Sequence, residues 1–163
     1  MIRALQLEDL DVLYELRQEA LIRCPASFGS TPEYESKEWM ADRMRENSEE
    51  DFVLGYFIDH RLVGLVGMKR ERQEKKRHKA WIWGLYVSRD YRNRHIGRKL
   101  LEACIDKSRS IHGLKAIVLS VTDASDRARK LYENLGFERW GIETNALFVD
   151  DSYYDEIHLK RSF

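Results

Sequence analysis

A short arginine-rich segment carries the residues best suited to binding an anion. The apolar run 85–87 leads into Arg92, Arg94 and Arg98, and Gly97 stands among them. An amphipathic pattern begins here, so the basic turn lies at the start of a predicted helix. The first turn of a helix presents unpaired N–H groups and the positive end of its dipole, and glycine lets a ligand approach the backbone. The segment therefore predicts a phosphate-binding turn, with a solvated helix start as the alternative.

A second segment, beyond the next apolar strand, combines small and aromatic residues. It contains Ala128, Leu131 and Tyr132, and it ends in Gly136 and Phe137. Together the two segments resemble the GNAT superfamily of N-acetyltransferases. The pyrophosphate loop of that family reads Arg/Gln-x-x-Gly-x-Gly/Ala, and its later helix reads Asn-x-x-Ala-x-x-Leu-Tyr-x-x-x-Gly-Phe. The order of the predicted elements agrees with this family over essentially the whole chain.

Two residues depart from the family pattern. His95 stands where the loop usually has glycine, and Ser125 stands where the later helix usually begins with asparagine. With a negative φ, His95 still donates its backbone N–H, so we expect phosphate binding to survive. We expect Ser125 to cap the N-terminus of its helix.

The resemblance implies that acetyl-CoA lies between the strands predicted at 78–87 and 115–121, which splay apart in this fold. Backbone groups of Leu85 and Val87 would pair with the pantetheine amides, and the pyrophosphate would lie on the basic turn. The residues that the resemblance assigns to acetyl-CoA are Leu85, Tyr86, Val87, Arg92, Asn93, Arg94, His95, Ile96, Gly97, Arg98, Ser125 and Ala128.

The resemblance also implies the catalytic residue. Tyr132 is the expected acid, because in this family its hydroxyl points at the thioester sulfur; core packing is the alternative for a lone helical tyrosine. The identity of the general base is left open. Trp81 stands where many members have Glu, and water, Ser120, Thr122 or a carboxylate from another loop are alternatives. By the same analogy Phe28 lies at the acceptor end. Trp81 and Trp83, two residues apart, fall on one face of their predicted strand; they are expected to line the substrate pocket, with core packing as the alternative.

Periodicity and turn residues predict the elements that hold these segments. Helices are expected over 7–22, 31–45, 96–110 and 125–135, and strands over 2–5, 52–58, 62–70, 78–87, 115–121, 137–144 and 153–159. The alternation of strand and helix in the second half requires one parallel pair in an otherwise antiparallel sheet. We therefore expect an α/β (α+β) fold with a single GNAT-like domain over residues 1–163, in which a mixed, mostly antiparallel sheet of about seven strands is flanked by about four helices.

The composition is typical of a globular cytoplasmic protein. The 28 basic side chains balance 28 acidic ones, and the basic run 69–79 lacks interleaved aromatics, so a solvated turn is favoured over a nucleic-acid surface. Cys24 and Cys104 form no disulfide framework and have no zinc partners, which favours a reducing compartment and no metal. We expect no signal peptide and no contact with a membrane, since no apolar run approaches roughly 18 residues.

These observations predict an acetyl-CoA-dependent N-acetyltransferase in which a primary amine attacks directly. A non-catalytic acetyl-CoA-binding sensor or adaptor is the alternative, and the intact Tyr132 argues against it. The acceptor is a small-molecule or peptide amine whose identity stays open. The acids of residues 1–51 and 143–156 favour a cationic one. A C-terminal strand at a sheet edge would allow two copies to pair as a homodimer.

Overall fold

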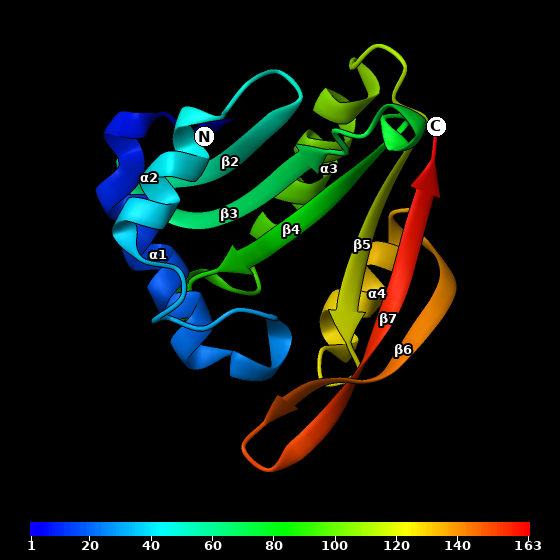
Figure 1. The fold of residues 1–163 in the computed structure, drawn as a ribbon. Helices are drawn as coiled ribbons and strands as arrows, with labels where there is room; N and C mark the ends of the chain where they lie inside the picture. The colour runs from blue at the N-terminus through cyan, green and yellow to red at the C-terminus, as the bar shows by residue number, and fades with distance from the viewer.

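The computed structural model describes residues 1–163 and arranges them around a seven-stranded sheet (Figure 1). The strands are β1 (Ile2–Ala4), β2 (Asp51–Ile58), β3 (Arg61–Arg70), β4 (Lys79–Val87), β5 (Ala116–Thr122), β6 (Glu138–Val149) and β7 (Ser152–Ser162). Their spatial order is β1-β2-β3-β4-β5-β7-β6, and only β4 and β5 run parallel. The predicted mixed, mostly antiparallel sheet is confirmed.

The four α-helices cover both faces of this sheet. They are α1 (Leu10–Arg23), α2 (Lys37–Arg45), α3 (Ile96–Arg109) and α4 (Asp126–Asn134). Helices α1 and α2 lie on one face, whereas α3 and α4 lie on the other (Figure 1). None of the helices combines the length and the apolar character that crossing a bilayer requires.

Alternating side chains of the strands build a separate core under each helical layer. Successive residues of a strand point to opposite faces. Accordingly, Phe52 and Leu54 of β2 pack in the core beneath α3, whereas Val53 between them packs beneath α1 and α2. Both faces of the central strands are therefore apolar, which holds the sheet rigidly between the two layers.

Strands β4 and β5 diverge partway along their length. They pair only from Lys79 to Trp81 on β4, and beyond that point β4 has no partner on this side. Gly84 has φ +68°, and the register between β3 and β4 shifts opposite it. This irregularity bends β4 away from β5 and opens the sheet (Figure 1).

Two details of the predicted fold are wrong. The helix expected from residue 31 begins only at Lys37, where Ser36 Oγ accepts a hydrogen bond from the Trp39 N–H at 3.1 Å. The preceding Glu35 is instead drawn into the protein to bind Arg17. The C-terminal strand β7 is not at an edge, because the β6–β7 hairpin places it between β5 and β6.

The basic run after β3 forms the expected turn to β4, and acidic partners neutralise part of it. Arg70 and Arg77 both bind the Glu50 carboxylate, and Arg72 binds Glu46. The run is thus tied to the acidic segment that precedes β2.

Candidate functional site

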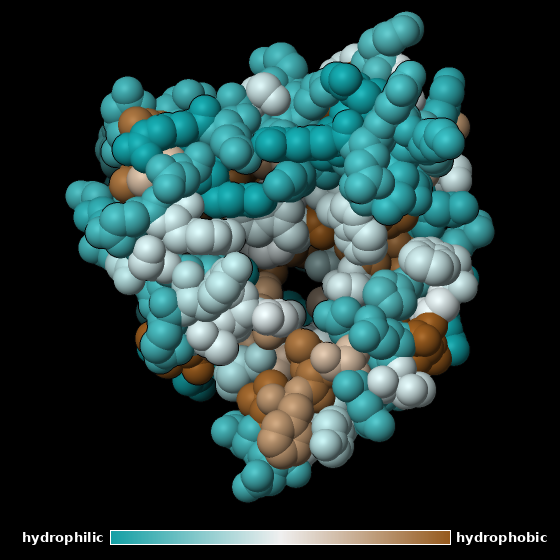
Figure 2. Space-filling model, viewed as in Figure 1, coloured by the Kyte–Doolittle hydropathy of each residue, from teal (hydrophilic) through white to brown (hydrophobic).

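A cleft of about 1010 Å³ opens where β4 and β5 diverge. It is the hollow near the centre of the face in Figure 2. The segments that line it are β4, the turn into α3, β5, α4 and the connection between α1 and α2. Fourteen of the fifteen residues predicted to bind acetyl-CoA, to act as the acid or to bind the acceptor line it: Phe28, Trp81, Leu85, Tyr86, Val87, Arg92, Asn93, His95, Ile96, Gly97, Arg98, Ser125, Ala128 and Tyr132.

Arg94 is the exception. Its side chain is exposed, and its guanidinium carbon lies 5.4 Å from the centre of the Tyr91 ring rather than in the cleft. The spacing of the arginines in the sequence does not show that Arg92 faces the cleft and Arg94 does not. In a turn, the directions of neighbouring side chains depend on the backbone angles.

The turn into α3 has an unusual backbone. Asn93 and His95 have φ of +64° and +59°, so the expected negative φ at His95 is wrong. His95 sits in the left-handed conformation that glycine adopts at no cost and other residues at roughly 1–2 kcal/mol. Its side chain does not cap the helix. The first N–H groups of α3, from Ile96 to Arg98, have no helical partners, and these three residues line the cleft.

Arg92 is partly engaged within the protein. Its Nε donates to the Val87 carbonyl at 2.9 Å, and its guanidinium carbon lies 5.2 Å from the centre of the Tyr86 ring. Tyr86 also packs in the core under α1, where its hydroxyl donates to Glu19 at 2.9 Å. Burial, followed by the Glu19 carboxylate, raises the pKa of Tyr86 to about 12. The Tyr86 hydroxyl is thus engaged within the protein.

Two basic residues that were not expected from the sequence to bind a ligand stand opposite this turn. Arg127 and Lys130 of α4 line the cleft, and Arg127 Nη2 donates to the Asn93 side chain at 2.8 Å. Their spacing of three places both on one face of the helix, which is the signal that identifies them. With Arg98 across the cleft, they make this end strongly basic.

Tyr132 belongs both to the core and to the cleft. Its ring is buried against Phe137, with centroids 5.9 Å apart. Burial raises the pKa of its hydroxyl well above the ordinary range, and no hydrogen bond contributes to the shift. A tyrosine hydroxyl is protonated at neutral pH even at its ordinary pKa of about 10, and burial keeps it so, so the hydroxyl can serve as a proton donor.

Ser125 does not cap α4 as expected. Its Oγ makes no bond to the helix backbone and instead lies 2.9 Å from Ser27 Oγ and 3.3 Å from Thr122 Oγ1. Thr122 in turn donates to the Ala26 carbonyl at 2.7 Å. The side chain ties α4 and β5 to the turn after α1, a contact between segments far apart in the sequence.

Aromatic side chains line the other end of the cleft. Trp83, whose role the sequence left open between core and pocket, packs against Gly67, where any Cβ would collide with its ring. Trp81 Nε1 donates to Glu71 at 2.9 Å. Phe28 lies over the buried Arg17, with the guanidinium carbon 4.7 Å from the ring centre.

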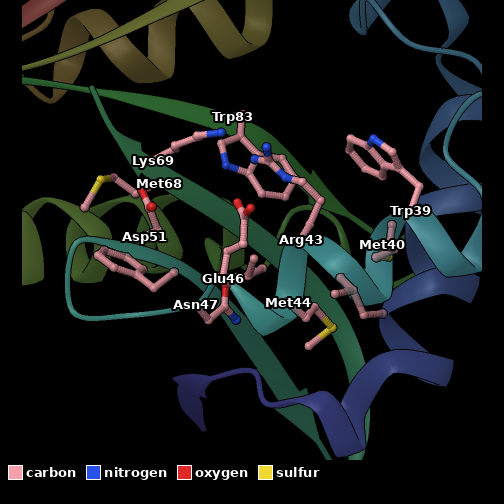
Figure 3. A pocket seen from close by; sticks show the side chains of 13 residues that line it. Trp39, Met40, Arg43, Met44, Glu46, Asn47, Asp51, Met68, Lys69 and Trp83 are labelled. Atoms are coloured by element: carbon pink, nitrogen blue, oxygen red, sulfur yellow. The ribbon is translucent and has the colours of Figure 1, made fainter. Parts of the chain in front are cut away.

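A smaller cavity of about 30 Å³ lies on the far side of Trp83, between α2 and strands β2 to β4 (Figure 3). Arg43 stands beside Trp83 there, with its guanidinium carbon 5.8 Å from the ring centre. The cavity has room for only about two waters, so it is no substrate site.

Acidic groups are scarce in the large cleft. Of the acids at both ends of the chain, only Glu156 lines it. The ligand atoms of Glu143, Glu156 and His158 lie within 4.8 Å of one another, which would suit a metal ion. His158 Nδ1 is buried without a partner, but Glu143 is exposed and no fourth ligand joins the three, so the cluster is not an enclosed metal site.

Comparison with known proteins places these features in a family. The model of the Acetyltransferase (GNAT) family matches residues 10–137. The Xenopus laevis protein named "Probable N-acetyltransferase camello" is 38% identical over 82 residues, which are 50% of this chain and 36% of that relative. The chain thus matches little more than a third of that relative's length.

Two solved structures share the fold over nearly their whole length. A GNAT-family acetyltransferase from Streptococcus pneumoniae superposes with a TM-score of 0.90 at 19% identity, covering 100% of this chain and 99% of the other. The yncA protein of Salmonella typhimurium, solved with its cofactor acetyl-CoA, has a TM-score of 0.89 at 16% identity, covering 99% and 92%.

Proposed function

Because the chain belongs to the Acetyltransferase (GNAT) family, we propose that it transfers an acetyl group from acetyl-CoA to a primary amine within the cleft between β4 and β5. One observation carries the proposal. The cleft joins a helix N-terminus with unpaired N–H groups, flanked by Arg98, Arg127 and Lys130, to a protonated tyrosine hydroxyl, that of Tyr132. The first arrangement suits a pyrophosphate, and the second suits a leaving thiolate.

The residues present fit acetyl-CoA. A Cβ added at Gly97 would meet only Val87 and Leu131, at 3.7 and 3.8 Å, so the packing of the protein does not require glycine there. Glycine is expected at the start of a helix where a phosphate touches the backbone. Gly97 fits that role, because it lies at the start of a helix that faces a basic cleft and packing does not require it. Leu85 lines the cleft on the part of β4 that has no pairing with β5. This free edge supports the proposal that the pantetheine arm pairs with β4 like an additional strand.

The chain's own residues supply the proton transfers. Acetyl-CoA supplies a thioester, at which the amine forms its C–N bond as the C–S bond breaks. Tyr132 donates its proton to the departing sulfur. Glu156, the one carboxylate that lines the cleft, accepts the proton from the amine. The tyrosine regains its proton from solvent when the products leave.

The test is thiol release in the presence of a panel of amines, measured for the wild type and for Tyr132→Phe. A thiol has a pKa near 8.5, so its thiolate needs little help to leave, and we expect the lower end of general-acid effects, about a 10²-fold loss of kcat. The Kd for acetyl-CoA should stay within about twofold, because the ring and its packing are kept.

Tyr56→Phe is the matched control, since Tyr56 packs against the same core but does not line the cleft. Equal turnover in the Tyr132→Phe protein would deny Tyr132 its role. Acetyl-CoA binding without thiol release from any amine would favour the non-catalytic sensor or adaptor.

A cytoplasmic location is also part of this proposal. Cys24 and Cys104 are both free thiols, as a reducing compartment would keep them.

A further inference from the structure

Four buried side-chain polar atoms of this protein have no hydrogen-bond partner, and three of them belong to residues that line the large cleft. These three are Arg17 Nη1, Ser30 Oγ and Trp83 Nε1. The great majority of buried polar groups in folded proteins are paired, because leaving one unpaired costs about 1–3 kcal/mol. Unpaired donors gathered in one cleft therefore point to a ligand that pairs with them.

Arg17 is the most informative of the three. Its side chain is only 6% exposed. Its Nε and Nη2 donate to the two carboxylate oxygens of Glu35, at 2.7 and 2.8 Å. Both hydrogens of Nη1 are left over by this side-on pairing, and no group of the protein accepts them. The guanidinium is held rigidly by Glu35, with one edge unused.

The unused edge lies against the β4 wall of the cleft. A Cβ built on Gly84 would stand 3.5 Å from Nη1. Gly84 belongs to the portion of β4 that has lost β5 as its partner, so it lies on the wall of the cleft. Phe28 covers the guanidinium. This end is separate from the turn into α3, whose N–H groups face the phosphates in the proposed function.

The chemistry of the site selects an oxygen. Nη1 offers only donors, so its partner must be an acceptor atom. Glu35 already balances the charge of Arg17, and the site is fixed in advance and shielded from water, which strengthens a hydrogen bond to a carbonyl or carboxylate oxygen. A polyamine or a simple alkylamine carries no such atom.

We propose that Arg17 Nη1 binds a carbonyl or carboxylate oxygen of the acceptor, so that the acceptor is an amine of the amino-acid or peptide class. This inference rests on the proposed acetyl transfer, and it names the kind of amine that the same cleft takes. Glu156 lines the cleft as well and is available to the amino group of such an acceptor.

The experiment compares thiol release with leucinamide, leucine and isoamylamine, which share one side chain and differ in the oxygen-bearing group. The quantity measured is the ratio of kcat/KM for each oxygen-bearing amine to that for isoamylamine, at one pH. The two amine classes differ in basicity, and that difference cancels when the ratio of a variant is divided by the wild-type ratio.

Arg17→Lys keeps a positive charge near Glu35 but places no donor at Nη1. We expect its ratio to fall at least about tenfold below that of the wild type, which corresponds to losing one hydrogen bond to a charged group. A fall for leucine assigns a carboxylate, a fall for leucinamide assigns a neutral carbonyl, and either supports the proposal. Arg43→Lys is the matched control, because Arg43 also stands beside Trp83 but outside the cleft; its ratio should equal that of the wild type.

If Arg17→Lys does not fold, the double replacement Arg17→Met with Glu35→Met removes the pair without leaving a buried charge, and the same fall is expected. An unchanged ratio in a folded variant overturns the inference and leaves acetyl transfer intact. Absence of thiol release with every amine overturns the proposed function and this inference with it.

Discussion

Replacing Glu35 by methionine would leave the Arg17 guanidinium buried without its counter-ion. The two side chains are 6% and 4% exposed and share hydrogen bonds of 2.7 and 2.8 Å, so water cannot replace the lost carboxylate without opening the connection between α1 and α2. Breaking a buried pair by removing one partner costs about 3–5 kcal/mol. For a chain of this length that corresponds to a fall in Tm of roughly 6–20 °C.

Urea unfolding, followed by far-UV circular dichroism and by tryptophan fluorescence, measures this loss. The double variant Arg17→Met with Glu35→Met should recover most of it, to within about 1–2 kcal/mol of the wild type, since both desolvation penalties disappear. Glu102→Met is the control, because the Arg98–Glu102 pair is exposed on α3 and is worth less than about 1 kcal/mol. A loss below about 1 kcal/mol for Glu35→Met, or a double variant less stable than the single one, would refute the reasoning.

The remaining predictions concern the cleft and the core. Gly97→Ala should fold as stably as the wild type, because its Cβ makes ordinary contacts, yet calorimetry should show acetyl-CoA binding about tenfold weaker, as expected when one phosphate hydrogen bond is lost; unchanged affinity would remove the turn from the binding site. Burial raises the pKa of Cys104 to about 12, whereas in the unfolded chain the thiol titrates near 8.5. Its stabilising contribution is therefore complete below about pH 8.5 and is lost as the pH rises toward 12, by up to about 1.4 kcal/mol per unit. Between pH 8 and pH 10, the free energy of unfolding should fall by about 2 kcal/mol more in the wild type than in Cys104→Ala; equal falls would show that the thiol is not the titrating group.

Local patterns were enough to predict the elements and much of the cleft. The strands around 52–58 and 62–70 were predicted by runs of apolar and β-branched residues, and they lie at 51–58 and 61–70. Gly136, with which the second segment ends, has a φ of +81°, the left-handed conformation in which a glycine commonly ends a helix. These features depend on residues close in the sequence, so their physical causes are visible in it.

The orientation of side chains in the turn into α3 could not be predicted from local sequence. Basic residues at a helix start predict an anion site, but the side chain that faces the cleft depends on backbone angles that no residue type specifies. Arg94 turns toward Tyr91, whereas Arg127 from a different helix reaches Asn93. His95 adopts the left-handed angle that the family's usual glycine would adopt, although its residue type disfavours it.

Only the tertiary structure decided which charges are buried. The sequence shows Arg17 and Glu35 as two of many charged residues, and nothing local marks them as partners. They become a pair because α1 packs on the sheet with Arg17 facing inward, and the chain before α2 must then bring in a carboxylate to offset the cost of burying a cation. Desolvation is a property of the assembled layers, and so is the divergence of β4 from β5. The fold could therefore be predicted from the sequence, whereas the unpaired edge of Arg17 in the cleft could not.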